Sequence, residues 1–219
     1  INMVSTSRGR NAQADQFQTG TLTLRLIDES GTFNPQNPSS PYYQLLTPMR
    51  KVQISANWNS VNYPIFSGYI TSYTTTQPEA SANEVAYTVI TAVDAFRLFQ
   101  NAQIATVSTA VTNELSGARI NAILDTISWP SSLRDVDAGL TQMAADPATA
   151  RTALAAMQNV EMSEYGSFYV SAGGFATFQD RSVTTAGSGA SPVVFNDNGT
   201  GIGYFNAVWR LDDTLVFNA

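Results

Sequence analysis

The stretch "TLTLRLI", Thr21 to Ile27, decides the fold, because its residues alternate strictly between apolar and polar. Leu22, Leu24 and Leu26 share one face of an extended chain, and the threonines and Arg25 occupy the other. A period of two is typical of a β-strand with one face buried and the other in water. We therefore predict a strand here and look for its partners further along the chain.

Three later segments continue the strand pattern. Residues 51–58, "KVQISANW", would place Val52, Ile54, Ala56 and Trp58 inward, and Asn59-Ser60 predicts a tight turn. In residues 61–73, Pro64 and Gly68 indicate an edge strand or a bulge rather than a central strand. Residues 83–94, "NEVAYTVITAVD", are mostly apolar on both faces, which favours a strand buried on both sides. Four or five antiparallel strands suggest a small barrel or sandwich.

The pattern changes to helices near Asp94. We predict a short helix capped by Asp94, a second with Ser116 as candidate cap and Pro130 as stop, and a third with Asp146 as cap and Pro147 at its first position. "SFYVSAGGFATFQD", residues 167–180, predicts a hairpin. The side chains expected to face inward are Ile120, Ile123, Leu124 and Ile127 in the second helix, and Leu154, Met157, Val160 and Met162 in the third.

The fold class is therefore α+β and mainly β, in three parts. Residues 1–95 form a β-barrel domain, and residues 96–183 form an inserted α+β module of helices and a hairpin. Residues 184–219 contain the linker "TTAGSGASP" and the beginning of a second β domain. Because the chain opens without Met and stops within a strand-like pattern, "TLVFNA", we expect it to be part of a longer protein.

Composition excludes several function classes. The 219 residues carry a net charge of −6, contain neither Cys nor His, and are only 13% charged. A nucleic-acid-binding protein normally carries a basic face, and thiol nucleophiles, imidazole bases and the usual zinc ligands are missing. No apolar run reaches the length of a membrane span. A surface so poor in charge is either covered by partners or rich in uncharged polar residues.

The acidic residues offer one alternative, a carboxylate pair of the glycosidase kind. Each acid has a structural explanation, because Asp94 and Asp146 read as helix caps, Asp28 and Glu29 fall in a turn, and Glu161 and Glu164 fall on the outer face of a helix. We expect Phe168, Phe175 and Phe178 to pack in the core rather than to stack on sugars. We therefore predict no enzyme, no catalytic residues, no cofactor and no metal site. The other acids that could join such a carboxylate pair are Glu114, Asp125, Asp135 and Asp137.

The segment after the first strand raises a separate question. "LIDESGTFNPQNPSSPYYQLLTPMR", Leu26 to Arg50, contains four prolines and shows no strand or helix pattern. We therefore expect a long loop with little regular structure. Such loops are uncommon inside compact domains and are usually functional.

The order of short motifs resembles that of the minor tail proteins of long-tailed phages, especially phages of actinobacteria. The likeness covers nearly the whole chain, including "SGARINAILDTISWPSSLRDVDAG" and the terminal "DDTLVFNA". One departure is that Asp28-Glu29-Ser30-Gly31 lengthens the tight turn of the family. The motifs that carry the likeness near the start are Arg8-Gly9-Arg10, Phe17 with Gly20 to Leu26, Phe33-Asn34-Pro35, Ser40-Pro41-Tyr42, Arg50-Lys51-Val52 and "ITAVDAFRLF".

This resemblance implies a structural virion protein, the hub of the baseplate or tail tip of a siphovirus. It implies tube-like β-barrel domains, two in each full-length subunit, in a homotrimer ring around a channel through which DNA passes transiently. The partners implied are the distal tail protein, the tape measure protein and other tail-tip proteins. An acidic channel wall would repel the phosphates of the passing DNA. The alternative is a host-binding module at the tail tip that recognises cell-wall carbohydrate, with a cell-wall hydrolase as a third candidate.

The resemblance also suggests a use for the proline-rich loop. Residues 30–48, here called the assembly loop, would lie against a neighbouring subunit, and Arg8 and Arg10 would lie at an interface. Prolines lower the conformational entropy lost on docking, and aromatic side chains supply contact area. The alternative is that the loop folds back over its own barrel. The residues proposed for contact are Phe33, Pro35, Pro41, Tyr42, Tyr43, Leu45 and Leu46.

Overall fold

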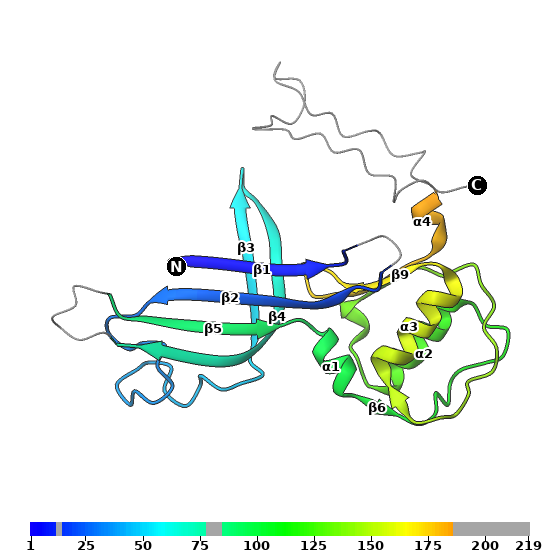
Figure 1. The fold of residues 1–219 in the computed structure, drawn as a ribbon, viewed down its shortest axis with the longest axis horizontal. Coiled ribbons are helices and arrows are strands. Elements are labelled where there is room, and N and C mark those ends of the chain that lie inside the picture. Colours follow the sequence, from blue (N-terminus) through cyan, green and yellow to red (C-terminus); the bar gives the residue numbers. More distant parts are fainter. Residues whose placement is uncertain (12–14, 78–84, 186–219) are drawn as a thin grey trace, which may run out of the picture.

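The computed structural model describes residues 1–11, 15–77 and 85–185, and the statements below concern these. Its largest part is a five-stranded antiparallel sheet in the order β1-β2-β5-β4-β3. The sheet curls into a half-barrel beside a smaller group of helices (Figure 1). The predicted class, α+β and mainly β, is confirmed. The strands are β1 (Met3–Gly9), β2 (Gln18–Ile27), β3 (Lys51–Trp58), β4 (Val61–Thr76) and β5 (Tyr87–Val93).

The alternation in the opening stretch is confirmed in β2. Leu22, Leu24 and Leu26 are buried on the inner face of the sheet, and the residues between them are exposed or half-buried. Each such leucine contributes roughly 1.5–3 kcal/mol by leaving water. β5 alternates in the same way, so it is not buried on both sides as predicted. The other buried members of this core are Phe66, Ile70, Ile90 and Ala92.

β4 explains why the prediction for residues 61–73 is only partly right. β4 pairs with β3 over residues 61–69 and with β5 over residues 69–76, so its two halves have different partners, and the part that contains Pro64 pairs with β3 alone. A proline is tolerated there because that half of the strand has a free side. Bulges at Ile54/Ser55 and Ile70/Ser72 shift the register, and bulges increase the local twist of a sheet.

The second part contains four α-helices among the described residues and packs around its own core. α2 and α3 lie side by side over a small sheet in which β10 pairs with β9 and, in parallel, with β7 (Figure 1). Phe99, Met157, Phe168 and Phe178 are fully buried between these layers. The elements are α1 (Phe96–Asn101), β6 (Gln103–Ile104), α2 (Ser116–Thr126), a 3-10 turn (Ser131–Leu133), β7 (Arg134–Val136), β8 (Arg151–Thr152), α3 (Ala153–Glu164), β9 (Ser167–Val170), β10 (Ala176–Gln179) and α4 (Arg181–Thr185).

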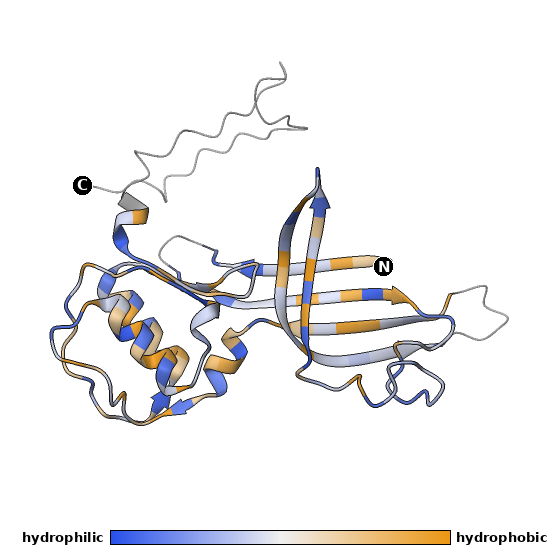
Figure 2. Ribbon diagram, turned by 180° about the vertical axis from the view of Figure 1, so that it is seen from behind, coloured by the Kyte–Doolittle hydropathy of each residue, from blue (hydrophilic) through white to orange (hydrophobic). Residues whose placement is uncertain are grey.

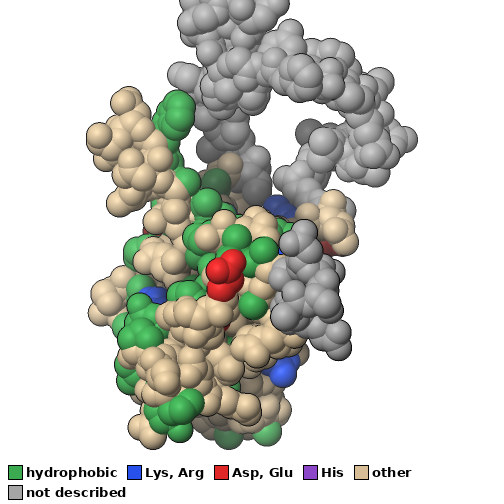
Figure 3. All heavy atoms as spheres, turned by 90° about the vertical axis from the view of Figure 1, so that its left-hand side faces the viewer, with side chains coloured by type: hydrophobic (Ala, Val, Ile, Leu, Met, Phe, Trp, Pro, Cys, Tyr) green, Lys and Arg blue, Asp and Glu red, His purple; other side chains and the backbone are tan. Residues whose placement is uncertain are grey.

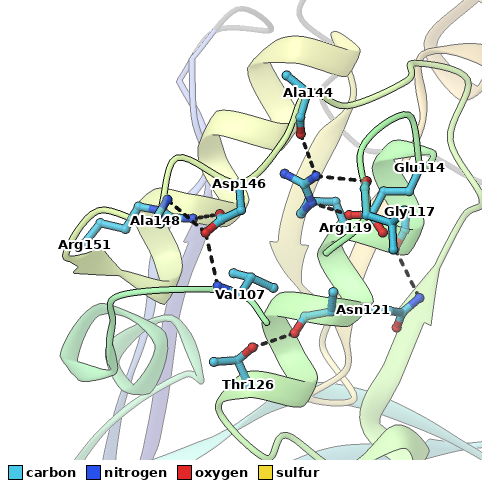
Figure 4. Close-up of polar contacts among 12 residues, drawn as sticks. Val107, Glu114, Gly117, Arg119, Asn121, Thr126, Ala144, Asp146, Ala148 and Arg151 are labelled. Atoms are coloured by element: carbon cyan, nitrogen blue, oxygen red, sulfur yellow. Dashed lines mark hydrogen bonds and ion pairs between the residues drawn. The ribbon is translucent and has the colours of Figure 1, made fainter. Parts of the chain in front are cut away.

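The predicted start of the third helix is wrong. α3 begins at Ala153, and its cap is Thr152, whose hydroxyl accepts a hydrogen bond from the Ala155 N–H at 3.1 Å. Asp146 instead accepts bonds from the N–H groups of Val107 and Ala148 and pairs with Arg151 (Figure 4). An Asp-Pro pair suits a turn as well as a helix start, and here the turn prevails because Asp146 ties two loops together.

Other predicted caps and faces also need correction. α2 begins at Ser116 itself, and the Ser116 hydroxyl donates to Glu164 instead of capping the helix. α1 begins at Phe96, so the residue at its N-cap position is Ala95 and not Asp94. The Asp94 carboxylate nevertheless accepts a hydrogen bond from the Phe96 N–H. Met162 and Phe175, predicted to be inside, are 56% and 38% exposed. The linker and second β domain predicted for residues 184–219 lie almost wholly outside the described residues.

Glu161 and Glu164 are buried, although the sequence pattern placed them on the outer face of a helix. Glu161 accepts a hydrogen bond from the Phe168 N–H at 3.0 Å, which joins α3 to β9. One oxygen of Glu164 accepts bonds from Ser116 Oγ at 2.6 Å, Leu140 N at 3.1 Å and Thr141 N at 2.7 Å. The segment at 138–141 covers this side of α3. Its N–H groups need an acceptor, and the Glu164 carboxylate provides it.

Candidate functional site

The acidic residues that could form a catalytic pair lie apart from one another, and most of them make ion pairs or hydrogen bonds that hold the fold together. Glu114 pairs with buried Arg119, which also donates to the Ala144 carbonyl at 2.7 Å (Figure 4). Asp125 pairs with Arg134 at 2.8 Å, and Asp137 accepts the Asp180 N–H at 3.1 Å. Within the described residues there is no group of three or more side chains that could hold a metal ion. The same part of the chain contains no helix long and apolar enough to cross a membrane.

The proline-rich loop contains no strand or helix, as predicted, but it is ordered by a regular succession of turns. Residues 28–43 form a series of five consecutive turns, here called the turn series, in which each turn begins at the residue where the previous one ends. The N–H of every third residue donates to the carbonyl three positions earlier at 3.1–3.2 Å. The residues linked successively by these bonds are Asp28, Gly31, Asn34, Asn37, Ser40 and Tyr43.

The sequence dictates this series through a three-residue repeat, N-P-x, N-P-x, S-P-x, at residues 34–42. Proline occupies the second position of each of these turns, where its fixed φ is favourable. The side chain that precedes each proline accepts the N–H two positions later, as in Gln36 N to Asn34 Oδ1 at 3.0 Å, Ser39 N to Asn37 Oδ1 at 3.0 Å and Tyr42 N to Ser40 Oγ at 3.0 Å. The loop therefore holds its shape by local bonds. The repeat was visible in the sequence and would have predicted it.

Asp28 anchors the series to the sheet. It is 3% exposed, and its carboxylate accepts the N–H groups of Thr32 at 2.6 Å and Phe33 at 2.9 Å. The same carboxylate accepts the hydroxyl of Thr88, in β5, at 2.8 Å. The first turn is therefore fixed to a central strand. At the far end of the loop, the Met49 N–H donates to the Ile70 carbonyl at 2.7 Å.

The predicted contact residues of the assembly loop divide between two environments. Phe33 packs against the sheet core and stacks on Tyr42 with ring centroids 5.8 Å apart. Tyr42, Tyr43 and Leu45 are 43%, 42% and 51% exposed, and Leu46 is half-buried. Pro35 and Pro41 are turn residues in the series. One end of the loop thus covers its own sheet, whereas the other presents apolar side chains to solvent.

The exposed end also carries backbone strain. Gln44 and Met49 adopt left-handed φ angles of 64° and 67°, which cost about 1–2 kcal/mol for residues other than glycine. Strain of this kind persists only where surrounding contacts enforce it. Here the Arg50 Nε donates to the Leu45 carbonyl at 2.9 Å and holds the segment closed. Leu45 and Met49 are therefore displayed on a fixed backbone.

Arg8 and Arg10 lie where the sheet meets the helical part. The Arg10 guanidinium lies 4.8 Å from the Phe17 ring centroid, and Phe17 stacks on Tyr169 of β9 at 4.9 Å. Arg8 lines a cavity of about 280 Å³ at the same junction, together with Phe17, Asp94 and Tyr169. In this chain, the two arginines therefore border a contact between its own two parts.

Asp94 fastens this junction. Its carboxylate accepts the N–H groups of Gly20 at 2.7 Å and Phe96 at 3.0 Å, and a Cβ on Gly20 would lie only 2.5 Å from it. Burial raises the pKa of Asp94 to about 6, although both hydrogen bonds and the charge of Arg8 act to lower it. The ionised carboxylate thus holds the joint at the expense of its own desolvation.

Asp94 is expected to make part of the stability depend on pH. Because its folded-state pKa of about 6 lies above the ordinary 3.8, the folded state binds the extra proton, and stability rises as pH falls through this window. The unfolding free energy of wild type, relative to Asp94→Asn, should be about 2–3 kcal/mol higher at pH 4 than at pH 7. Urea titrations of both proteins measure this. A difference that does not vary with pH would contradict the assignment.

Comparisons with known proteins add little. No protein-family model matches the sequence, and no curated protein matches it. Among solved structures, the fold resembles that of the 43 kDa tail protein of prophage MuSo2 from Shewanella oneidensis, with a TM-score of 0.44 and 8% sequence identity. The match covers 80% of this chain and 54% of that protein, so the chain spans about half of its length.

Proposed function

We propose that this chain is a structural subunit of a phage tail, and that its task is assembly rather than catalysis. The observation that carries the proposal is the assembly loop, which the turn series stiffens. No residue from Ser30 to Met49 is charged, and the side chains of Tyr43 and Leu45 are exposed. An apolar surface on a rigid backbone loses little entropy when a partner covers it. Figure 3, which faces the end of the molecule where this loop lies, shows mostly uncharged side chains.

The sequence resemblance supports the same function from another direction. Two of its motifs, Phe33-Asn34-Pro35 and Ser40-Pro41-Tyr42, are the segments that build the turn series. The resemblance to minor tail proteins therefore coincides with the part of the chain best built for contact.

In finer detail, we propose the hub of a siphovirus baseplate at the tail tip. The half-barrel of residues 1–95, the module of residues 96–183 and a second β domain beginning in 184–219 would form a homotrimer ring. The ring would surround the channel for DNA and connect the distal tail protein to the tape measure protein and other tip proteins. Immunogold labelling of purified virions tests this. Label confined to the tail tip supports the hub, label along the tail indicates a tube protein, and unlabelled particles contradict the proposal.

One observation favours the alternative, a cell-wall carbohydrate-binding module. Trp58 and Tyr63 are 76% and 50% exposed, and exposed aromatic rings are suited to stacking on sugars. Binding of the purified chain to host cell-wall fragments, lost on Trp58→Ala, would favour this module over the hub.

Replacing Tyr43 and Leu45 by serine is expected to impair tail assembly. Both side chains are exposed, so the fold should lose no more than about 0.5 kcal/mol, whereas loss of interface anchors weakens an association about tenfold or more. The measurement is the yield of infectious particles from a phage that carries the variant. Tyr165→Asn is the matched control, because Tyr165 is 80% exposed in the helical part and Asn suits its left-handed φ of 56°. Equal yields from both variants would contradict a role for the loop.

A further inference from the structure

β1 is an edge strand whose outer side has no partner among the described residues. It pairs with β2 alone, in the sheet order β1-β2-β5-β4-β3. In an antiparallel pair, every second residue of an edge strand points its N–H and C=O groups away from the sheet. β1 therefore presents a row of such groups along one side of the half-barrel (Figure 1). A row of this kind binds another extended segment.

β1 lacks the features that usually keep another strand away from an exposed edge. Proteins block such edges with lysine, with proline or with a bulge inside the strand. β1 contains neither lysine nor proline, and its bulge lies at its end, between Ser7 and Gly9. Its one charged residue is Arg8, and Figure 2 shows the strand strongly hydrophilic only at its C-terminal end.

The opposite edge of the sheet is protected. β3 begins at Lys51, and a bulge after Ile54 interrupts its pairing with β4. Beyond the bulge, residues 55–64 pair only with one another, because the pairing of β4 with β5 starts further along the chain. Asn59-Ser60 closes this hairpin with φ angles of 50° and 64°, which confirms the predicted turn. A further strand is therefore expected at the β1 edge.

The inner face of the sheet is also left open at β1. Val4 lies opposite Leu24, and Thr6 lies opposite Leu22, so these side chains share the inner face. The two leucines are 6% and 1% exposed, whereas Val4 is 39% exposed and β1 has no buried residue. A strand beyond β1 with one apolar face would cover Val4 and extend the core.

Residues 202–211, "IGYFNAVWRL", have the sequence that such a strand requires. Phe205, Ala207 and Trp209 recur at every second position and would form one apolar face. The segment is long enough to pair with all of β1, and its one charged residue is Arg210. These residues lie outside the described part of the chain, so the pattern is taken from the sequence alone.

The described part of the chain ends close to the end of β1. Arg8 and Gly9 border the same cavity as Val170 of β9. β9 pairs with β10, and along this pair Gln179 lies about 10 Å from Val170, at roughly 3.3 Å per residue. α4 follows β10 directly and ends at Thr185. The remaining chain therefore begins near the C-terminal end of β1.

This connection favours a segment of the same chain over any separate partner. The 16 residues 186–201 join α4 to the segment, and a flexible chain of that length has a root-mean-square end-to-end distance of about 22 Å. Sites joined by a linker that matches their separation meet at an effective concentration in the millimolar range. A separate strand at micromolar concentration would have to bind about a thousandfold more tightly to compete.

We propose that residues 202–211 add to the free edge of β1 as an antiparallel strand of the same sheet. A chain that arrives at the C-terminal end of β1 and runs back along it is antiparallel, and this direction keeps Arg210 away from Arg8. The β domain that begins in 184–219 would then share a sheet with the half-barrel. This inference goes beyond the tail function and does not depend on it.

Amide hydrogen exchange on the full chain measures whether the edge is covered. On a free edge every second amide of β1 exchanges rapidly, whereas a covered edge protects consecutive amides from Val4 to Ser7. Ala207→Pro removes a donor from the middle of the added strand. It should accelerate exchange at alternate β1 amides about tenfold or more and leave the amides of β5 unchanged. Ala190→Pro, the same change outside the segment, is the control and should have an effect of less than about twofold.

Cysteine pairs identify which segment covers the edge, because the chain has no cysteine of its own. Full-length protein with Ser5→Cys and Asn206→Cys carries one thiol on each of the two strands. A short bismaleimide should join these thiols within one chain, at low and at high protein concentration alike. Gln53→Cys with Asn206→Cys is the control on the β3 edge and should give background only.

Three results would overturn the proposal. Alternating exchange along β1 in the unmodified protein would mean that the edge is free. Continuous protection without a cross-link within the chain would mean that another segment covers it. Cross-linked dimer from a mixture of the Ser5→Cys and Asn206→Cys proteins, in place of cross-linked monomer, would mean that a second copy covers it. The tail function is tested separately by the labelling of virions.

Discussion

Replacing Glu164 by alanine is expected to lower the free energy of unfolding by about 3–5 kcal/mol, the cost of breaking a buried charge network. Glu164 is fully buried, and Ser116, Leu140 and Thr141 all donate to one of its oxygens. Without the carboxylate, two backbone N–H groups and a hydroxyl lose their acceptor inside the protein, which costs about 1–3 kcal/mol for each group that stays unsatisfied. α2, α3 and the segment at 138–141 would lose their common attachment.

Glu164→Gln separates hydrogen bonding from charge. The amide oxygen can accept all three bonds, but the amide nitrogen then faces Arg181, whose Nε lies 3.7 Å from the other carboxylate oxygen. We expect a loss of about 1–2 kcal/mol, smaller than for alanine. Asp125→Ala is the control. The Asp125 side chain is exposed, so its ion pair with Arg134 is worth at most about 1 kcal/mol. Chemical denaturation measures all three, and equal losses from Glu164→Ala and Asp125→Ala would contradict the network.

Glu164 should also respond to pH in the opposite sense to Asp94. Burial alone would raise its pKa, but hydrogen bonds from Ser116, Thr141 and Leu140 outweigh burial and hold the pKa below the ordinary value. A depressed pKa stabilises the fold at neutral pH, and this contribution is lost as pH falls through the folded-state value. The two buried acids therefore act in different pH ranges: the contribution of Asp94 grows as pH falls from neutral, whereas that of Glu164 is lost only below its ordinary pKa of 4.5.

Replacing Asp28 by alanine is expected to cost about 2–4 kcal/mol and to release the start of the assembly loop. The carboxylate satisfies the N–H groups of Thr32 and Phe33 and the hydroxyl of Thr88, all at 2.9 Å or less. Hydrogen bonds to a carboxylate are worth about 1.5–3 kcal/mol each when only one partner is removed. Amide hydrogen exchange at residues 32 and 33 should accelerate, because their acceptor is gone.

Glu29→Ala is the matched control for this change. Glu29 is the neighbouring acid but is exposed, so its loss should change stability by less than about 0.5 kcal/mol. If Asp28→Ala unfolds at the same denaturant concentration as Glu29→Ala, the anchoring role of Asp28 is wrong. Unchanged exchange at Thr32 and Phe33 would lead to the same conclusion.

Local patterns predicted the interior well where burial follows periodicity. The leucines of β2 and the inward side chains Met157 and Val160 of α3 were identified correctly, because strands and helices repeat with fixed periods. Ala56 and Trp58 were placed wrongly because alternation reports a strand but not where its sheet ends. Glu161 and Glu164 were placed wrongly because their donors lie outside the helix, which a helical pattern does not contain. The donor to Glu161 is in the strand that follows the helix, and the donors to Glu164 are 23 to 48 positions away.

The candidate site shows the same limit. The sequence singled out the proline-rich loop and its aromatic residues, and the structure places Tyr42, Tyr43 and Leu45 at its surface. The role of Asp28 as an anchor to Thr88 was missed, because these residues are 60 positions apart. The exposed apolar side chains at the end of the β3–β4 hairpin were missed, because two of them, Ala56 and Trp58, were assigned to the core.

The turn series also bears on how the chain reaches its native state. Each of its backbone bonds spans three residues, so it forms on the time scale of local loop closure, well below about 100 ns. Pairing of Leu22 with Ala92 must bring together residues 70 positions apart, a slow search for any chain. The loop can thus sample its final shape long before β2 pairs with β5. Because the loop is stiff, the segment between these two strands has fewer conformations to search.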